Sequence, residues 1–223
     1  VHYRCCRHAL FGHGKGRKEM ISILDYGSGN ISAFSHIYKK SNIPHKIVSS
    51  AEELKGATKI ILPGVGAFDI VMASLDRSGM RGLLDELVLE KEVPILGVCV
   101  GMQIMAEASE EGTERGLSWI KGSVKKIDTT TLQHKPTTPH MGWNDITIKK
   151  PSHIFDNIDD RKGFYFLHSY YFACANKDEV LATVNYGTNL PCAVHINNIY
   201  GFQFHPEKSH SNGVALLQNF AGL

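Results

Sequence analysis

The chain contains 223 residues, 43% of them hydrophobic and 21% charged, with a formal net charge of +2 at pH 7. These values are ordinary for a globular protein, and the small net charge excludes a general attraction to nucleic acid or membranes. The sequence offers no run of about 18 apolar residues to span a bilayer, and it begins without the apolar core of a signal peptide. The cysteines form no CxxC pair and no regular disulfide framework, which predicts a reducing, cytoplasmic location. They are Cys5, Cys6, Cys99, Cys174 and Cys192.

Residues 1–19 differ from the rest because they are basic and rich in histidine, with no sustained strand or helix period. Cys5, Cys6, His8 and His13 could be read as a metal site, but their spacing fits no common zinc pattern. We therefore expect residues 1–19 to be a vector-derived or upstream-translated tail. A single domain is expected over 20–223, with no metal and no cofactor.

From Met20 onwards, apolar runs alternate with segments of helical spacing. The pattern predicts strands at 20–26, 45–50, 59–64 and 93–99, a helix at 31–41, and a long helical region that ends near Glu92. Strands that are apolar on both faces are typical of a parallel sheet covered by helices.

The second half of the chain has a different pattern. A short helix is predicted at 102–111, and helical spacing returns only at 213–223. Between them lie β-leaning segments at 122–128, 143–150, 163–172, 180–187 and 192–204. Because these strands follow one another without crossover helices, they predict antiparallel additions to the sheet. The expected fold is an α/β three-layer sandwich with a mainly parallel central sheet and antiparallel strands in its second half.

Cys99 lies between two glycines in "GVCVG", at the end of an apolar run and before a helical segment. This order is the sequence form of a nucleophile elbow, with cysteine in the position of the serine. The bend would present the sulfur at the carboxyl end of the sheet, and the N-terminus of the next helix would favour the thiolate. A buried core cysteine explains the motif equally well.

A thiol nucleophile generally needs a base, and the base needs a group that orients it. His205 follows an apolar run in "GFQFHPEKS", and Glu207 comes two residues later. In an extended chain these two side chains face the same way, so the carboxylate can hold the imidazole. Together with the elbow, this predicts a triad of Cys99, His205 and Glu207 in that chain order.

An acyl-transfer site also needs donors for the developing oxyanion. The segment "LPGVGAF" ends the preceding strand with Gly64, Val65 and Gly66, whose amides could point towards Cys99 together with the amide of Val100. An ordinary loop or a phosphate cradle would also explain a lone G-x-G, but the sequence lacks both G-x-G-x-x-G and GK[ST].

Three motifs in this order, "PGVGAF", "GVCVGMQ" and "GFQFHPEKS", resemble those of the class I (triad) glutamine amidotransferases. "DYGSGN", "PHMGWN" and "FYFLHSYYF" are similar to the branch that supplies the glutaminase subunit of imidazole glycerol phosphate synthase. The resemblance covers 20–223 and implies a flavodoxin-like core. Ser28 and Val100 depart from the usual pattern but leave the triad intact.

The resemblance implies roles for matching residues. Cys99 would attack the carboxamide of glutamine, His205 would protonate the departing ammonia and later activate water, and Glu207 would hold His205. Gly64, Val65 and Gly66 match the family's oxyanion strand, in which a peptide group must flip before its amide can donate to the oxyanion. Residues matching glutamine-binding positions are Gln103, Ser169 and Tyr170.

The resemblance also implies a partner, a (β/α)8-barrel cyclase that receives the ammonia and makes imidazole glycerol phosphate and aminoimidazole carboxamide ribonucleotide. Asn30, Trp143, Tyr165 and Lys208 match positions at or near that interface. Simpler explanations stay open at this stage: Trp143 and Tyr165 as core aromatics, Lys208 as a solvated charge and Asn30 as a helix cap.

Two other functions remain open. A glutaminase could feed a related cyclase-partnered enzyme in surface polysaccharide amidination, which "HMGWN" does not exclude, although that motif argues against the anthranilate, guanylate and pyridoxal branches. Alternatively, the chain could be a non-catalytic regulatory subunit, although such proteins typically lose a triad member. A metal-dependent enzyme is the least favoured alternative.

Overall fold

A computed structural model describes residues 20–132, 138–159 and 161–223. The predicted tail at 1–19, with Cys5, Cys6, His8 and His13, lies outside the described residues. None of the described helices is both long enough and apolar enough to cross a membrane.

The main sheet has the strand order β2-β1-β3-β4-β13-β12-β11-β8. Its first five members in that order run parallel, and the last three add antiparallel pairs. Its strands are β1 (Ile21–Leu24), β2 (His45–Val48), β3 (Lys59–Gly64), β4 (Ile95–Cys99), β8 (Ile146–Ile148), β11 (Val180–Tyr186), β12 (Thr188–Ile196) and β13 (Ile199–Phe202). The mixed sheet predicted from the sequence is thereby confirmed.

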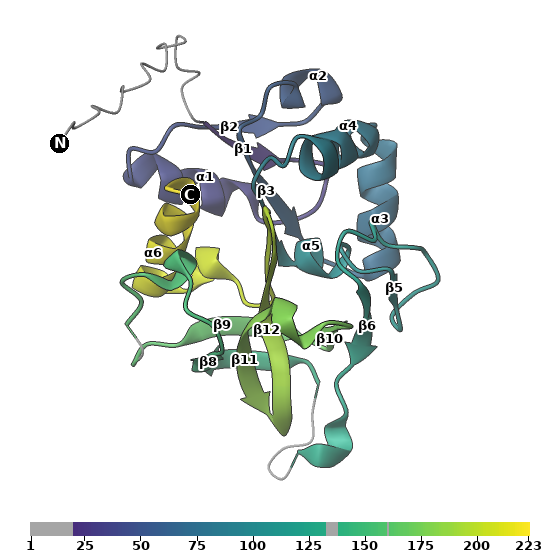
Figure 1. Ribbon diagram of the computed structural model, residues 1–223, viewed down its shortest axis with the longest axis vertical. Helices are drawn as coiled ribbons and strands as arrows, with labels where there is room; N and C mark the ends of the chain where they lie inside the picture. Colours follow the sequence, from purple (N-terminus) through teal and green to yellow (C-terminus); the bar gives the residue numbers. More distant parts are fainter. Residues whose placement is uncertain (1–19, 133–137, 160) are drawn as a thin grey trace, which may run out of the picture.

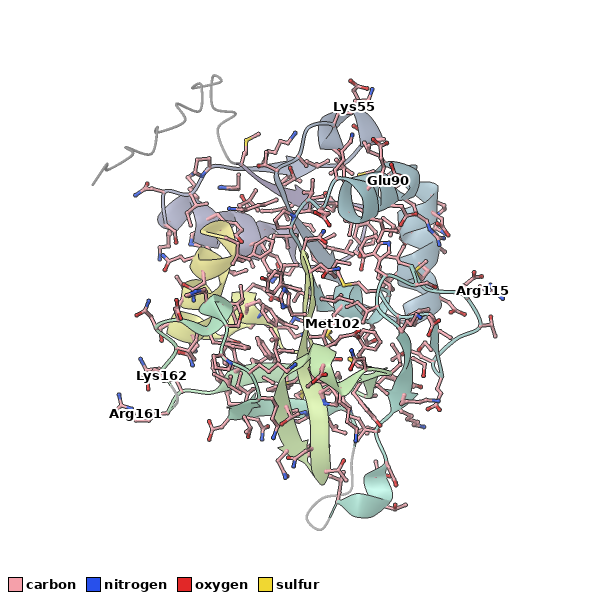
Figure 2. The ribbon with its side chains drawn as sticks, in the orientation of Figure 1. Lys55, Glu90, Met102, Arg115, Arg161 and Lys162 are labelled. Atoms are coloured by element: carbon pink, nitrogen blue, oxygen red, sulfur yellow. The ribbon has the colours of Figure 1, made fainter. Side chains whose placement is uncertain are left out.

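Helices cover both faces of this sheet and complete the three layers: α1 and α6 lie on one side, and α3, α4 and α5 on the other (Figure 1). They are α1 (Ile31–Lys40), α2 (Ala51–Leu54), α3 (Phe68–Arg77), α4 (Arg81–Asp85), α5 (Val100–Gln103) and α6 (His210–Ala221). In Figure 2, Met102 of α5 lies in the middle of the molecule, whereas the labelled charged side chains lie at its rim.

Two smaller sheets complete the second half of the chain. One has the order β10-β6-β5, and the other is a ribbon of β7 and β9. Their strands are β5 (Ala108–Ser109), β6 (Gly122–Lys126), β7 (His140–Asn144), β9 (Phe164–His168) and β10 (Tyr170–Cys174). The predicted segments 143–150 and 163–172 are therefore each divided between two sheets.

The predicted helix at 102–111 is wrong, since α5 begins at Val100 and ends at Gln103. The carbonyls of Ile104, Met105 and Ala106 accept hydrogen bonds from amides in 117–120, so they are not available to continue a helix. After this turn the chain forms β5 beside β6.

The long helical region predicted to end near Glu92 consists of three pieces. These are α3, α4 and a π-helical turn over Glu86–Glu90. The polar stretch before β3 also holds the short helix α2, which the sequence pattern did not reveal. Ser50 caps it by accepting a hydrogen bond from the Glu53 amide.

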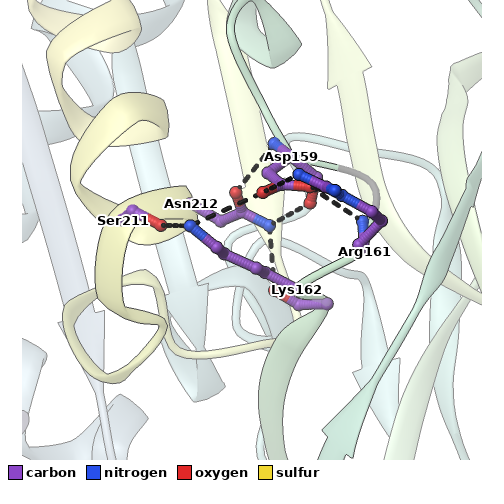
Figure 3. A network of polar contacts seen from close by, with 6 residues as sticks. Asp159, Arg161, Lys162, Ser211 and Asn212 are labelled. Atoms are coloured by element: carbon purple, nitrogen blue, oxygen red, sulfur yellow. Dashed lines mark hydrogen bonds and ion pairs between the residues drawn. The ribbon is translucent and has the colours of Figure 1, made fainter.

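A polar network fixes the segment before β9 to the first turn of α6 (Figure 3). The side chain of Asn212 accepts from the amide of Asp159 at 2.9 Å and donates to the carbonyls of Asp159 and Gly163. Arg161 donates to the Asp159 carboxylate at 3.0 Å. Lys162 donates to the hydroxyl of Ser211 at 3.3 Å. The network sets the position at which β9 enters the candidate site.

Candidate active site

Cys99 lies at the sharp turn between β4 and α5, with φ 56° and ψ −115°. This conformation is strained for a residue with a side chain, and such strain is concentrated at functional sites. The neighbouring glycines make the turn possible, because a Cβ on Gly101 would lie 2.0 Å from the Leu62 carbonyl oxygen and one on Gly97 would lie 2.6 Å from Met105 Cε. The elbow geometry predicted from "GVCVG" is present.

Helix α5 has only four residues, so it supplies little of the helix dipole that was expected to favour the thiolate. The surroundings of the sulfur are instead set by side chains. Cys192 is the fully buried cysteine of the core, whereas Cys99 is 5% exposed and lines a cavity.

His205 reaches the site because β13 runs parallel to β4 as its direct neighbour, with Phe202 paired to Val98. Parallel neighbours end at the same edge of a sheet, so the residues after β13 lie beside the elbow. The backbone of His205 is fixed by a hydrogen bond from its amide to the Tyr165 carbonyl at 2.9 Å and by one from the Ser209 hydroxyl to its carbonyl at 2.7 Å.

The Glu207 carboxylate contacts His205 Nδ1 at 2.9 Å, so the predicted pairing is present. The reason differs from the prediction. His205 begins a 3-10 turn at Pro206–Lys208, so a turn and not an extended strand brings the two side chains together. Both side chains are nearly fully buried, and Glu207 Oε2 has no partner among the described residues.

The protonation of His205 is set by opposing causes. Burial lowers the pKa of His205, but hydrogen bonds to Cys99 and Glu207 outweigh the burial and raise the pKa to about 10. A ring that stays protonated beside a sulfur favours the thiolate form of that sulfur. His205 therefore lies as a protonated ring between Cys99 and Glu207 at the carboxyl end of the sheet.

In the segment predicted to supply oxyanion donors, the Val65 amide is engaged by Ser28. The Val65 amide donates to Ser28 Oγ at 2.9 Å, and the Ser28 hydroxyl donates to the Val65 carbonyl at 3.0 Å. Gly66, which follows, has φ +118°. The Val100 amide belongs to the first turn of α5, where amides have no partner within the helix. Sequence reasoning noted Ser28 as a departure but did not foresee these contacts.

A cavity of about 280 Å³ opens above Cys99 and His205. The residues predicted to bind glutamine, Gln103, Ser169 and Tyr170, all line it together with Cys99 and His205. Its other lining residues are Val65, Gly66, Val100, Glu111, Pro139, Leu167, His168 and Lys208. Of these, Glu111, Pro139, Leu167 and His168 were not foreseen from the sequence. Among the described residues, no group of three or more histidine, cysteine or acidic side chains is arranged to hold a metal ion.

Three of the residues predicted at a partner interface lie together beside the cavity. Trp143 is 45% exposed and lies 6.1 Å from Tyr165 between ring centroids, and Lys208 Nζ lies 5.7 Å from the Tyr165 ring centroid. His210, which sequence reasoning missed, stacks on Trp143 at 4.9 Å. Asn30 precedes α1 without a side-chain cap bond, and the structure gives it no contact with this group.

Comparisons with known proteins identify the family. The family described as glutamine amidotransferase class-I matches residues 22–222. Two curated relatives carry the name imidazole glycerol phosphate synthase subunit HisH. The one from Leptospira borgpetersenii is 53% identical, over 92% of this chain and 100% of its own length. The one from Bdellovibrio bacteriovorus is 51% identical, over 91% and 99%.

Solved structures share the fold at low sequence identity. The structure of PurLQS from Thermotoga maritima aligns with a TM-score of 0.69 at 17% identity, over 92% of this chain and 99% of that one. A structure described as a glutamine amidotransferase aligns with a TM-score of 0.67 at 20% identity, over 91% and 99%.

The fold, the elbow cysteine and the family match define one class, and the chain belongs to the class I glutamine amidotransferases. Within that class, its curated relatives at 51–53% identity are HisH subunits of imidazole glycerol phosphate synthase.

Proposed function

We propose that this chain is the glutaminase subunit of imidazole glycerol phosphate synthase, acting in histidine biosynthesis in the cytoplasm. It hydrolyses glutamine to glutamate and ammonia. The observation that carries the proposal is that Cys99 and His205 line one cavity, with Glu207 held against His205, in a chain whose relatives carry the HisH name. We take 20–223 as one catalytic domain, with no cofactor and no metal.

The reaction starts at the sulfur. Cys99 Sγ attacks the side-chain carboxamide carbon of glutamine, and His205 gives its proton to the nitrogen as the C–N bond breaks. Ammonia leaves, and a γ-glutamyl thioester remains on Cys99. His205 then takes a proton from water, whose oxygen attacks the thioester carbon and releases glutamate. Glu207 keeps the imidazole in place throughout both steps.

The oxyanion of each tetrahedral intermediate needs amide donors. The Val100 amide supplies one directly after the nucleophile. The second comes from the segment of Gly64, Val65 and Gly66, once the Val65 amide leaves the hydroxyl of Ser28. Ser28 is therefore expected to delay completion of the oxyanion hole.

Glutamine occupies the cavity with its carboxamide at Cys99. Gln103 lies one helical turn after Cys99 and approaches the substrate from α5. Ser169 and Tyr170 join β9 to β10 and present backbone groups to the amino acid end of glutamine. This placement leaves the mouth of the cavity beside Trp143 and Tyr165.

The partner is a (β/α)8-barrel cyclase subunit that docks over this mouth. Ammonia that escaped into water would be protonated and lost as a nucleophile, so a covered exit is required. Met141, Trp143 and Leu167 are exposed apolar side chains on the β7–β9 ribbon, and Tyr165 and Lys208 lie beside them. An apolar patch next to a reaction cavity suits a partner surface. Asn30 is proposed at the margin of this interface.

The test measures glutamine hydrolysis by the purified chain with and without a cyclase subunit and its nucleotide ligand. We expect activity that rises with the partner and disappears in Cys99→Ala. If the Cys99→Ala variant still showed glutamine-dependent turnover, the assignment of Cys99 as the nucleophile would be wrong. Complementation of a histidine auxotroph lacking the glutaminase separates the histidine pathway from polysaccharide amidination, because only a histidine-pathway subunit restores growth.

A further inference from the structure

Four buried polar side chains lie outside the triad and beside the cavity: Gln103, His140, His168 and Gln203. Gln203 is 0% exposed. Because a buried polar group without a partner is destabilising, such groups are almost always hydrogen-bonded. Their contacts therefore indicate how the interior of the site is organised.

The contacts converge on one backbone carbonyl, that of Tyr170 in the glutamine-binding segment. It accepts hydrogen bonds from His168 Nδ1 at 2.8 Å and from Gln103 Nε2 at 3.1 Å. A carbonyl oxygen only accepts, so both side chains must donate to it. This fixes the direction of every hydrogen bond that follows.

The first branch leads to the nucleophile. Gln103 Nε2 also donates to Gln203 Oε1 at 3.0 Å. With its oxygen engaged there, Gln203 turns its Nε2 towards Cys99 Sγ, 3.8 Å away. The amide orientation of Gln203 is thus set by Gln103, and its two ends are not interchangeable.

The second branch leads to the β7–β9 ribbon. His168 Nε2 lies 2.9 Å from His140 Nδ1, and His140 Nε2 lies 2.7 Å from Asn144 Oδ1. The His140 ring stacks between Phe166 and Tyr186, at 4.8 and 4.1 Å between centroids. The pair is therefore held rigidly between the ribbon and β11.

The tautomers of His168 and His140 follow from which ring nitrogens donate a hydrogen bond and which accept one. His168 donates through Nδ1, so if it is neutral its Nε2 accepts from His140 Nδ1. The Asn144 atom that faces His140 Nε2 is Oδ1, which only accepts, so neutral His140 can accept at Nε2 only if the Asn144 amide rotates by 180° to present its NH₂ group. Burial lowers the pKa of both rings, that of His168 to about 3, so both are neutral near pH 7. Both histidines are then Nδ1–H tautomers.

We propose that Gln203 is a further catalytic residue, whose side-chain NH₂ group donates to Cys99 Sγ and favours the thiolate over the thiol. Gln103 is a positioning residue that holds this amide from the opposite side. His168 and His140 are positioning residues one step further away, because they fix the Tyr170 carbonyl to which Gln103 also donates. The inference rests on the proposed role of Cys99 as the nucleophile. No atom is transferred in this step, because Gln203 acts only as a hydrogen-bond donor, and a charged acceptor makes the stronger bond.

The test replaces Gln203 with methionine, which keeps the length of the side chain but removes the donor. Gln218→Met on the exposed face of α6 is the matched control. The readout is the rate of Cys99 alkylation by iodoacetamide against pH, followed by mass spectrometry of the Cys99 peptide, without partner or glutamine. The other titratable side chains of the residues that line the cavity are unchanged, as is Glu207 behind His205. These residues are Glu111, His168, Tyr170, His205 and Lys208.

In Gln203→Met we expect the midpoint of the alkylation profile to move up by about one pH unit and kcat to fall by about tenfold, consistent with loss of a hydrogen bond to a charged group. KM for glutamine should change less than kcat, and Gln218→Met should match the unmodified chain. An unchanged profile in a folded, active Gln203→Met variant overturns the inference and leaves the glutaminase assignment standing. If the unmodified chain showed no glutaminase activity, the proposed function itself would be wrong.

A second measurement needs no substitution. Long-range ¹H–¹⁵N NMR spectra distinguish histidine tautomers, and free imidazole favours Nε2–H. We expect His168 as a neutral Nδ1–H tautomer from about pH 5 to 8 and His140 as a neutral Nδ1–H tautomer near pH 7 to 8, since burial lowers the pKa of both rings. An Nε2–H tautomer at His168 reverses the direction of the chain and overturns the positioning role of the pair.

Discussion

His205 is the residue on which burial and neighbouring charge act in opposite directions. Its surroundings exclude water, which disfavours the imidazolium, while Cys99 and Glu207 favour it more strongly. The ring stays protonated at pH 7 because Cys99 and Glu207 are both close to it. The protonation of the ring therefore depends on the sulfur beside it.

Replacing the sulfur should show this coupling. In Cys99→Ala, one of the two contacts that raise the pKa of His205 is lost while the burial that lowers it remains. We expect the pKa of His205 to fall below its value of about 10 in the unmodified chain. The measurement is the NMR titration of the ring Cε1–H signal, with exposed His153 as an internal reference. If the midpoint of the His205 titration did not change, Glu207 alone would keep the imidazole protonated.

At the scale of elements, the elbow depends on glycines that let backbone approach backbone. An alanine at position 101 would place its Cβ against the Leu62 carbonyl oxygen at 2.0 Å, so β3 and α5 would have to separate. We expect Gly101→Ala to destabilise the fold by about 1–3 kcal/mol and to remove glutaminase activity. The measurement is the free energy of unfolding in urea.

The matched control for this substitution is Gly82→Ala in α4, where an added Cβ meets no atom within 4 Å. Since alanine favours a helix interior over glycine by about 1 kcal/mol, this variant should be as stable as the original or slightly more so. Equal destabilisation by both alanines would contradict the close-approach argument.

The segment before β9 depends on Asp159 for its link to Arg161. Hydrogen bonds from Arg161 lower the pKa of the Asp159 carboxyl to about 2. A lowered pKa means that the carboxylate stabilises the fold above its ordinary value of 3.8, and that this stabilisation is lost as the pH falls towards 2. In Asp159→Asn we expect lower stability than the original at pH 6, and a difference that shrinks between pH 4 and 2. Urea unfolding at several pH values tests this, and a difference independent of pH would argue against it.

The sequence predicted the elements with strong local signals. Apolar runs such as 59–64 and 93–99 identified strands, and the glycines around Cys99 identified the elbow, because each requirement is written in adjacent residues. The helix at 102–111 was wrong because its carbonyls bond to residues more than ten positions away. Contacts such as Ser28 with Val65 and Gln203 with Cys99 were missed for the same reason, since no local pattern encodes them.

At the scale of the whole molecule, the β7–β9 ribbon connects the outer surface to the cavity. Leu167 and Tyr165 of β9 pair with Met141 and Trp143 of β7, so one strand pair presents an apolar face and also leads into the glutamine-binding segment. His140 on the same ribbon packs against Tyr186 of β11. A displacement of the β7–β9 ribbon would therefore be transmitted to the active site.

Trp143 is expected to be central to partner docking, because buried tryptophans dominate many interfaces. Trp143→Ala should weaken association with the cyclase by about 2 kcal/mol, a Kd roughly 30-fold higher. Isothermal titration calorimetry measures this directly. Ile47→Ala is the control, since Ile47 is similarly exposed but lies on β2, an edge strand of the main sheet, and not on the separate β7–β9 ribbon. Equal losses in both variants would argue against docking on the ribbon.

The place of β13 in the sheet also determines when the active site can exist. β13 inserts between β4 and β12, yet it follows every other strand in the sequence. During synthesis, Cys99 is made long before His205, so the growing chain carries a thiol without its base. Cys99 and His205 come together only when β13 pairs between β4 and β12. An incomplete or misfolded chain therefore carries no activated thiolate, and the reactivity of Cys99 indicates that β13 has taken its place in the sheet.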